Sequence, residues 1–315
     1  MKNHYYSFNS IDDPAALVHR GLEMKQKNIK TDLGKNKTIG LVFLNPSLRT
    51  RMSTHEAANR LSMHVITFNG QDAWSWEMED GAVMNVNKTE HIKDAARVIS
   101  SYVDIIGIRC FAGLQDITDD RQDSVIKKFM QYSSVPVINL ESAALHPCQS
   151  LADMITMQEI YGDKKLKVAL SWAPHPKALP QAVAQSFSQW AIGMGHEVVI
   201  AHPEGYNLDS SYTKGALITQ DQAEAIRDAD IVYTKSWTSE IDYGKSTTAY
   251  NHWTIDEHKM AIADGGKFMH CLPIRRNVVA TDGVLDGAQS LIYSQAENRL
   301  YAAQAVIENI LKSTK

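Results

Sequence analysis

Residues 38–51 read Thr-Ile-Gly-Leu-Val-Phe-Leu-Asn-Pro-Ser-Leu-Arg-Thr-Arg, an apolar run followed by a turn and the start of a helix. A nearly continuous apolar run of this length is typical of a strand whose sheet is covered by helices on both faces. Ser47 predicts the N-cap of the helix, because its side chain can accept a free N–H of the first turn. The stretch therefore predicts a strand-turn-helix unit of an α/β fold.

The same alternation of short β-branched runs and longer helical segments continues along the chain. Strands spaced by helices predict parallel sheets with right-handed crossovers. The predicted strands are Thr38–Leu44, His64–Phe68, Asp104–Cys110, Val135–Leu140, Lys167–Trp172, Glu197–Ala201, Asp230–Thr234 and Lys267–Cys271. The predicted helices are Thr50–Leu61, His91–Tyr102, Gln149–Tyr161, Pro180–Met194, Gln220–Asp228, Thr254–Ala263 and Gln295–Leu311. The fold class is thus α/β, with two doubly wound parallel-sheet domains around a cleft.

The length of the chain agrees with two domains. It has 315 residues, and a single hydrophobic core usually stops growing at about this size. The helix over 149–161 falls between the two series of strands and links the two halves. We therefore expect one domain over residues 1–148, joined by the C-terminal helix at about 295–315, and a second over residues 149–294.

Composition excludes several classes of protein. The 32 basic and 36 acidic side chains give a net charge of -4, which offers no general attraction for nucleic acid or an anionic membrane. No stretch approaches the roughly 20 apolar residues of a membrane span. The three cysteines are far apart and odd in number, which argues against a disulfide framework or structural zinc and favours a reducing cytoplasm. A bound anion must therefore be held by a local group of cations.

The turn at Ser47 is a candidate anion site. It lies at the carboxyl end of a predicted strand, where open α/β sheets bind their ligands, and the N–H groups of the first helical turn are free there. Arg49 and Arg51 add planar guanidiniums matched to phosphate or carboxylate oxygens, and Thr50 adds a hydroxyl. Taken alone, the stretch is equally compatible with a capped surface helix that carries two solvated arginines.

Further polar residues follow other predicted strands. Arg109 ends one strand, His146-Pro147-Cys148-Gln149 follows the next, and His270-Cys271-Leu272-Pro273 ends the last. Each has a structural explanation of its own: an exposed strand end, a helix cap, a small buried hydrophobe. Together they indicate a ligand site, because the carboxyl ends of parallel strands open into one crevice.

The chain resembles the aspartate/ornithine carbamoyltransferase family, on its ornithine side. The resemblance is carried by four features in this order: Ser-Leu-Arg-Thr-Arg, a strand-end Arg, His-Pro-x-Gln and His-Cys-Leu-Pro. One departure is informative. Where ornithine enzymes carry an Asp for the α-ammonium and a Ser-Met-Gly stretch, residues 233–239 have neither, and Lys235 would repel an ammonium. Residues 172–180 are similar to the proline-rich loop of the N-acylornithine branch, which implies a knotted loop in the second domain.

The resemblance implies a reaction in arginine biosynthesis: the carbamoyl group of carbamoyl phosphate passes to the δ-amine of an N-acyl-L-ornithine, giving an N-acylcitrulline and phosphate. It implies carbamoyl-phosphate binding by Ser47, Leu48, Arg49, Thr50, Trp74, Arg109, His146, Gln149, Cys271, Leu272 and Arg299, with Arg109, His146, Thr50 and Cys271 as the catalytic set. Cys271 would act through its backbone carbonyl and not as a nucleophile. For the acceptor it implies Glu141, His175, Lys235, Arg275 and Thr89.

The resemblance also bears on partners and on the acyl group. No metal or organic cofactor is expected, because carbamoyl phosphate is already activated. Trp74 matches a residue lent to a neighbouring subunit's site, which implies a homotrimer with shared sites. At the position of Thr89, members of this branch that use N-acetylornithine have Glu, and those that use N-succinylornithine have Pro. Because Thr does not repel the distal carboxylate of a succinyl group, Thr89 favours N-succinyl-L-ornithine. N-acetyl-L-ornithine, then free L-ornithine, and a non-catalytic protein that binds phosphate metabolites remain as alternatives.

Overall fold

The computed structural model describes residues 4–70, 75–85 and 87–313. The chain divides into two compact units. The first unit comprises Met1–Ala112, Thr118–Cys148 and Arg299–Lys315, and the second comprises Gly113–Ile117 and Gln149–Asn298. Within the described ranges, none of the helices combines the length and the apolar character needed to cross a membrane.

The first unit is built on a four-stranded parallel sheet in the order β2-β1-β5-β6. Its strands are β1 (Thr38–Phe43), β2 (His64–Asn69), β5 (Ile105–Arg109) and β6 (Val137–Glu141). The chain leaves β1 toward β2 on one side and returns to β5 on the other, so β1 and β5 flank the point where the strand order reverses. At the carboxyl ends Phe43 pairs with Arg109, and Arg109 pairs with Glu141. Ligand sites of doubly wound folds form at such a reversal.

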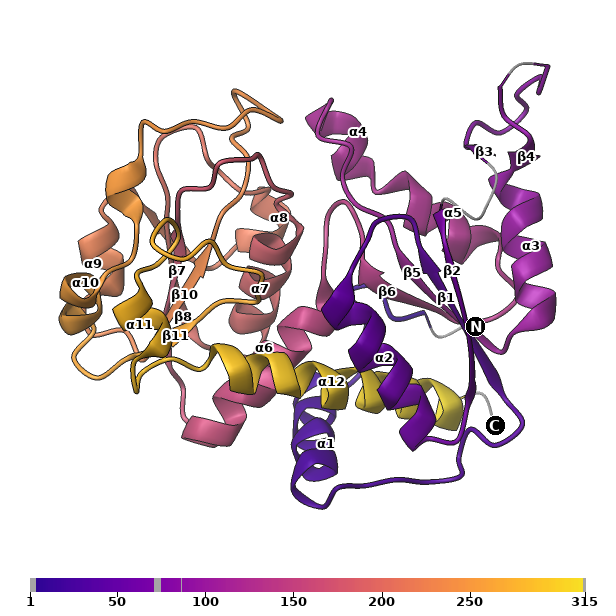
Figure 1. Cartoon of the computed structure of the whole chain (residues 1–315), viewed down its shortest axis with the longest axis horizontal. Helices are drawn as coiled ribbons and strands as arrows, with labels where there is room; N and C mark the ends of the chain where they lie inside the picture. The colour runs from indigo at the N-terminus through magenta and orange to yellow at the C-terminus, as the bar shows by residue number, and fades with distance from the viewer. Residues whose placement is uncertain (1–3, 71–74, 86, 314–315) are drawn as a thin grey trace. The chain divides into compact units, whose positions relative to one another are not determined.

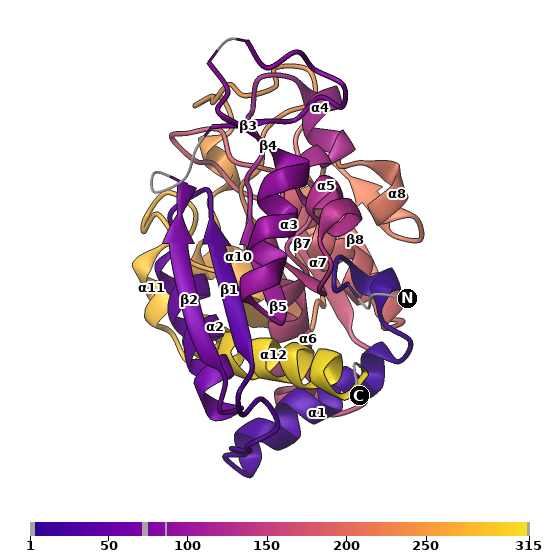
Figure 2. The same cartoon turned by 90° about the vertical axis from the view of Figure 1, so that its right-hand side faces the viewer.

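Helices cover both faces of this sheet, as a doubly wound unit requires. Helices α3 (Ile92–Tyr102) and α5 (Ser124–Tyr132) lie side by side on one face, and α2 (Leu48–Arg60) lies on the other (Figures 1 and 2). Between sheet and helices, Ile92, Ile106 and Phe129 belong to one buried apolar cluster. The remaining elements are a 3₁₀ turn at Phe8–Ser10, α1 (Pro14–Gln26), the strand pair β3 (Trp76–Glu77) and β4 (Glu90–His91), and α4 (Ile117–Gln122).

The second unit has a five-stranded parallel sheet in the order β11-β10-β7-β8-β9. Its strands are β7 (Lys167–Trp172), β8 (Glu197–Ala201), β9 (Leu217–Thr219), β10 (Ile231–Lys235) and β11 (Lys267–Met269). Its helices are α7 (Ala182–Gly193), α8 (Ser210–Thr213), α9 (Gln222–Ile226), α10 (Glu257–Ile262), α11 (Asp282–Asp286) and a 3₁₀ turn at Asn251–Trp253. Two longer helices, α6 (Pro147–Tyr161) and α12 (Ile292–Ser313), carry the chain from one unit into the other.

The two parallel sheets confirm the predicted fold class. Some element ends differ from the prediction: β11 ends at Met269 and not at Cys271, and α10 begins at Glu257 and not at Thr254. After β11 the chain enters a turn in which Leu272 has φ of 53°, a conformation that an extended strand cannot contain. The sequence reading also omitted α1, although Asp13 caps it through Ala16 N–H and Pro14 occupies its first turn, both of which are recognisable signals.

Candidate active site

The turn between β1 and α2 has the predicted cap. Ser47 has an extended backbone, and its side chain accepts a hydrogen bond from the Thr50 N–H at 3.2 Å. This satisfies one N–H of the first turn and fixes the path of the backbone into α2. Thr50 is buried by this arrangement, whereas Leu48 is exposed. The Ser47 N-cap predicted from sequence is confirmed.

Two guanidiniums meet at the Thr50 hydroxyl. Arg109 Nη1 donates to Thr50 Oγ1 at 3.2 Å, and Arg299 Nη2 donates to the same oxygen at 2.5 Å. A hydroxyl has two acceptor sites and one proton, so these two donors occupy its lone pairs. The Thr50 proton is therefore left to donate to a third group, which suits a carbonyl or phosphoryl oxygen.

Glu141 and His146 complete this group, which we call the Thr50 cluster: Thr50, Arg109, Glu141, His146 and Arg299. Arg109 Nη1 donates a short hydrogen bond to Glu141 Oε2, and His146 Nε2 lies 3.3 Å from that same oxygen. Arg299 Nη2 lies 3.5 Å from His146 Nε2. All five side chains are buried. They meet because β1, β5 and β6 are neighbours whose carboxyl ends lie side by side.

The charges of the Thr50 cluster favour an anion. Apart from His146, the cluster holds two guanidiniums and one carboxylate, a net charge of about +1. Charges removed from water are costly unless they are paired and hydrogen-bonded. The face of the Phe111 ring, 4.2 Å from the Arg109 guanidinium, supplies further but weaker compensation. An anionic ligand at the Thr50 hydroxyl would balance the cluster.

The loop that leads from Glu141 to His146 is held by a residue that the sequence reading missed. Asp123 Oδ2 accepts hydrogen bonds from Ser142 Oγ at 2.6 Å and Tyr6 Oη at 2.8 Å, and its Oδ1 accepts the Ala143 N–H at 3.0 Å. Burial raises the pKa of Asp123, and the hydrogen bonds from Ser142 and Tyr6 oppose that rise. No motif surrounds Asp123, so no sequence signal pointed to it.

The backbone of Glu141 is unusual in its own right. Its φ of 154° lies in a region that favours glycine, and such conformations cost of order 1–3 kcal/mol. The anchored loop that follows and the ion pair with Arg109 hold Glu141 in this conformation. Strain of this kind is concentrated at functional sites, which agrees with the position of Glu141 in the Thr50 cluster.

In the second unit, Gln149 and the His270–Leu272 turn are the predicted carbamoyl contacts. Gln149 is buried in the first turn of α6 and donates from Nε2 to Asp153 Oδ1 at 2.8 Å. Cys271 is buried, and Leu272 N–H donates to His270 Nδ1 at 2.9 Å. The positive φ of Leu272 makes this a tight turn at the carboxyl end of β11.

The predicted acceptor residues of the second unit also follow neighbouring strands. His175 follows β7, Lys235 ends β10, and Arg275 follows β11. His175 Nδ1 lies 2.8 Å from the Lys177 carbonyl oxygen and 3.1 Å from the Lys177 backbone nitrogen. Burial lowers the pKa of His175, the hydrogen bond with the Lys177 backbone opposes this, and the nearby positive charges of Lys235 and Arg275 add to the lowering. His175 is therefore neutral near pH 7, beside two cations suited to a carboxylate.

Three other residues stand apart from these groups. Trp74 lies outside the described residues. Thr89 is exposed in the loop before β4. The guanidinium of Arg51 does not join the Thr50 cluster: it donates to Asn69 Oδ1 and lies 4.9 Å from the Phe43 ring centroid. The expectation that Arg51 adds a second fork to the anion site is therefore not met, because Arg51 points to the end of β2.

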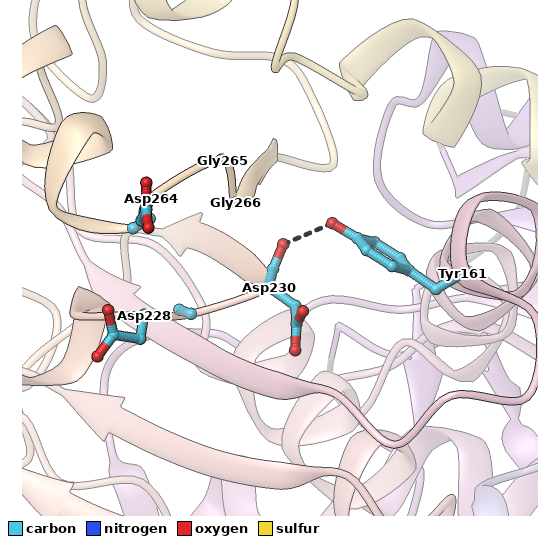
Figure 3. Close-up of a pocket in the computed structure, with 8 residues that line it drawn as sticks. Tyr161, Asp228, Asp230, Asp264, Gly265 and Gly266 are labelled. Atoms are coloured by element: carbon cyan, nitrogen blue, oxygen red, sulfur yellow. Dashed lines mark hydrogen bonds between the residues drawn. The ribbon is translucent and has the colours of Figure 1, made fainter.

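A separate pocket of about 220 Å³ in the second unit is lined by Asp228, Asp230, Asp264 and Tyr161, among others (Figure 3). Tyr161 Oη donates to the Asp230 carbonyl at 2.9 Å. The Asp230 carboxylate accepts from Lys164 Nζ at 2.6 Å and from a backbone N–H, so it is engaged in the fold. In the part of the chain that is described, no group of three or more His, Cys, Asp and Glu side chains could hold a metal ion.

Comparison with known proteins gives one consistent family. Residues 4–159 match the carbamoyl-P binding domain of aspartate/ornithine carbamoyltransferase, and residues 180–310 match its Asp/Orn binding domain. The chain is 40% identical over 307 residues to an N-succinylornithine carbamoyltransferase of Bacteroides fragilis, covering 96% of each. It is 40% identical over 314 residues to an N-acetylornithine carbamoyltransferase of Xanthomonas axonopodis pv. citri, covering 93% of this chain and 91% of the relative.

Solved structures lead to the same group. An acetylornithine transcarbamylase complexed with acetylcitrulline has a TM-score of 0.93 and 37% identity, and the alignment covers 98% of both chains. A mutant N-acetyl-L-ornithine transcarbamylase complexed with carbamyl phosphate and N-succinyl-L-norvaline has a TM-score of 0.92 and 38% identity, covering 98% of this chain and 99% of the other. Identity at this level over whole chains is evidence of common descent as well as of a common fold.

Proposed function

Because the chain belongs to the aspartate/ornithine carbamoyltransferase family, we propose that it is an N-acyl-L-ornithine carbamoyltransferase whose acceptor is N-succinyl-L-ornithine. The products are N-succinyl-L-citrulline and phosphate, and the proposed setting is arginine biosynthesis in the cytoplasm. The observation that carries the transfer reaction is the pair of buried guanidiniums on the Thr50 hydroxyl. That arrangement is built for an oxygen-rich anion with a polarised carbonyl.

The proposed chemistry is a single acyl transfer. The N–H groups of the first turn of α2, with Arg49 and Arg299, hold the phosphate of carbamoyl phosphate. Arg109, His146 and the Thr50 hydroxyl polarise the carbamoyl carbonyl and stabilise the oxyanion that forms on it. The neutral δ-amine attacks the carbonyl carbon and a C–N bond forms. The C–O bond to phosphate breaks, and the phosphate leaves with the bond electrons and takes up the proton that the amine gives up. Holding the two substrates in line supplies much of the acceleration.

The acceptor side is proposed from charge. His175, Lys235 and Arg275 provide one neutral imidazole and two cations, and no carboxylate among them to receive an α-ammonium. An acylated α-amine removes that ammonium, and the α-carboxylate of the substrate suits Lys235 and Arg275. The succinyl group adds a second carboxylate. The uncharged Thr89 side chain does not repel that second carboxylate. The relative from Bacteroides fragilis is named for the same substrate.

A turnover assay with three acceptors tests the proposal. Citrulline-type product is measured with carbamoyl phosphate and, in turn, N-succinyl-L-ornithine, N-acetyl-L-ornithine and free L-ornithine. We expect the highest kcat/KM with the succinyl substrate. Higher activity with the acetyl substrate would leave the transferase reaction intact and reject the succinyl assignment. Activity on free ornithine alone would reject the argument from Lys235.

A variant at Thr89 sharpens the choice of acyl group. Thr89→Glu adds a carboxylate that repels the distal carboxylate of a succinyl group but not a neutral acetyl group. We expect the succinyl-to-acetyl ratio of kcat/KM to fall by about tenfold, since about 1.4 kcal/mol of repulsion corresponds to that factor. Thr89→Gln has nearly the same size without the charge and is the matched control, for which the ratio is expected to stay within about twofold of wild type.

The alternative from another class is a protein that binds phosphate metabolites without catalysis. It predicts saturable binding of carbamoyl phosphate but no product with any of the three acceptors. Calorimetric titration of carbamoyl phosphate beside the turnover assay separates the two. Product formation that is lost in Arg49→Ala, with the fold retained by circular dichroism, would exclude the non-catalytic alternative.

A further inference from the structure

We propose that Asp153 is a positioning residue that fixes the Gln149 side-chain amide and the His270–Leu272 turn in the orientation needed for the carbamoyl NH2 group. The inference rests on the proposed function, because it assigns a role within carbamoyl-phosphate recognition. Asp153 is fully buried in α6 and belongs to none of the motifs that suggested the site. Its contacts reach two of those motifs at once.

The first contact determines which way Gln149 faces. Gln149 and Asp153 are four residues apart on α6, a spacing at which side chains of a helix meet. Gln149 Nε2 donates to Asp153 Oδ1 at 2.8 Å. An ionised carboxylate can only accept hydrogen bonds, so the nitrogen end of the amide must face it. The oxygen end of Gln149 is thereby turned away from Asp153.

That oxygen is available for a ligand. Among the residues that the structure describes, none donates a hydrogen bond to Gln149 Oε1, although the atom is buried. A buried carbonyl oxygen without a donor costs about 1–3 kcal/mol, so its retention calls for an explanation. The carbamoyl group carries an NH2 that needs an acceptor. Gln149 Oε1 is the acceptor expected for that NH2, in line with the carbamoyl contact that the family resemblance implies for Gln149.

The second contact runs through α12. Gln295 Nε2 donates to the same Asp153 oxygen at 2.7 Å, which fixes the Gln295 amide in turn. Gln295 Oε1 then accepts the backbone N–H of His270 at 2.9 Å. His270 opens the tight turn that contains Cys271, whose backbone carbonyl is the other expected acceptor for the carbamoyl NH2. The Asp153 carboxylate thus orients both groups expected to accept hydrogen bonds from the carbamoyl NH2: the Gln149 amide directly, and the turn that begins at His270 through Gln295.

The surroundings of Asp153 use it as a hydrogen-bond acceptor. Both amide nitrogens that approach Asp153 Oδ1 are donors. Replacing this carboxylate by an amide would change the balance, because an Asn side chain can satisfy Gln149 in either orientation. Gln149 Oε1 would then no longer be held toward the ligand.

The test compares carbamoyl phosphate with acetyl phosphate, which has a methyl group in place of the NH2. The KM for carbamoyl phosphate and the inhibition constant for acetyl phosphate are measured in wild type and Asp153→Asn. We expect the KM to rise about tenfold, the loss of roughly one well-placed hydrogen bond, and the inhibition constant to change by less than about twofold. A general loosening of the site would weaken both ligands alike.

Two further variants make the result specific. Thr156→Val is the matched control: Thr156 Oγ1 accepts from Asn298 Nδ2 at 3.0 Å, so the variant removes another α6–α12 hydrogen bond without touching Gln149. We expect it to lower the midpoint of thermal unfolding and to leave the ratio of the two constants unchanged. In a Gln149→Ala background, Asp153→Asn should add little to the KM for carbamoyl phosphate, because the two act as a unit.

Several outcomes would overturn the proposal. Parallel weakening of both ligands in Asp153→Asn, or an additive effect on top of Gln149→Ala, would show a purely structural role. If Asp153→Asn does not fold, Asp153→Glu, which keeps the charge but moves it, is measured in the same way, and an unchanged ratio rejects the proposal. Absence of product with the wild-type protein would refute the proposed function instead, a result that the same assays record separately.

Discussion

Thr50 shows how one side chain organises a site. Its hydroxyl accepts from Arg109 and Arg299, which come from β5 and from the C-terminal helix. The oxygen thus joins the two guanidiniums, while Glu141 pairs with that of Arg109. The hydroxyl therefore sets the spacing of the two cations and retains a proton for the substrate. This double role explains why a threonine, and not an apolar residue of the same shape, lies at the buried start of α2.

The first prediction concerns this hydroxyl. Thr50→Val keeps the shape of the side chain but removes both the acceptor for the two arginines and the donor for the ligand. We expect kcat/KM for carbamoyl phosphate to fall by about 10²-fold, the size seen when one oxyanion-stabilising donor is lost. Steady-state kinetics measure the loss, with thermal unfolding to show that the fold is retained.

Ser53→Ala is the matched control for Thr50→Val. Ser53 lies one turn further along α2 and donates to the Thr50 backbone carbonyl at 3.3 Å. Its removal takes one hydroxyl from the same helix but leaves both arginine contacts in place. We expect kcat/KM to remain within about threefold of wild type, the effect of at most one weak hydrogen bond. A wild-type rate in Thr50→Val would contradict the assigned role of the hydroxyl.

At the scale of elements, the order of the strands assembles the functional groups. In the first unit, β1, β5 and β6 are adjacent, so the start of α2, Arg109 and Glu141 meet at one edge. In the second unit, β7, β10 and β11 are adjacent and bring His175, Lys235 and Arg275 to one edge in the same way. Each sheet places its residues at the carboxyl ends of strands on both sides of its strand reversal.

The second prediction concerns the start of β7 and β8. His196 lies in the turn before β8, and its Nδ1 accepts the Leu166 N–H just before β7 at 3.2 Å. Burial, with a smaller contribution from the charge of Lys165, lowers the pKa of His196 from 6.5 to about 4, and Asp230 opposes part of this shift. The folded state thus favours neutral histidine. Its contribution to stability is complete above pH 6.5 and is lost as the pH falls from 6.5 through about 4.

The measurement is the free energy of unfolding in urea at pH 7.5 and at pH 5. His196→Asn keeps an acceptor for the Leu166 N–H but does not titrate in this range. We expect the wild-type protein to lose more stability between the two pH values than His196→Asn does. Equal losses in the two proteins would show that His196 does not contribute to the acid sensitivity.

At the scale of the whole molecule, net charge is a poor guide to what the chain binds. The total of -4 conceals the buried Thr50 cluster, with its two guanidiniums against one carboxylate. The second unit adds Lys235 and Arg275 beside His175. Local groups of cations bind anions irrespective of the total charge, because burial lowers the effective dielectric constant around them.

The third prediction concerns assembly. The resemblance implies a homotrimer in which Trp74 of one subunit serves the neighbouring site. If so, a Trp74→Ala subunit and a Thr50→Val subunit, each with low activity alone, should regain activity when they are mixed. One site needs Thr50 from its own subunit and Trp74 from its neighbour, so random equal mixing should restore about one quarter of the sites.

Mixed assemblies are prepared by unfolding and refolding the two variants together, and mass is measured by light scattering. We expect a mass of about three times the 35.2 kDa chain and partial recovery of activity. The control is a mixture of Thr50→Val with Arg49→Ala, in which both defects lie on the same side of the site and no recovery is expected. A trimer without recovery would reject the sharing of Trp74, and a monomer with full activity would reject the assembly.

Local features of this chain were readable from its sequence. The apolar runs predicted eight strands of the two large sheets, and Ser47 predicted the cap of α2, because strands of buried sheets and helix caps depend on nearby residues. The i, i+4 spacing of Gln149 and Asp153 was likewise visible in principle. The short strands β3, β4 and β9 were not, since two or three residues carry too little pattern.

The partners within the site needed the tertiary structure. Arg299 reaches Thr50 across 249 residues, and Gln295 reaches Asp153 across 142. Arg49 and Arg51 stand two residues apart in the same motif, yet Arg51 faces Asn69. No local pattern encodes such choices, because they depend on which strands become neighbours and on which buried group must be paired. The sequence motifs thus indicated the reaction, whereas long-range packing determined which side chains contact one another in the site.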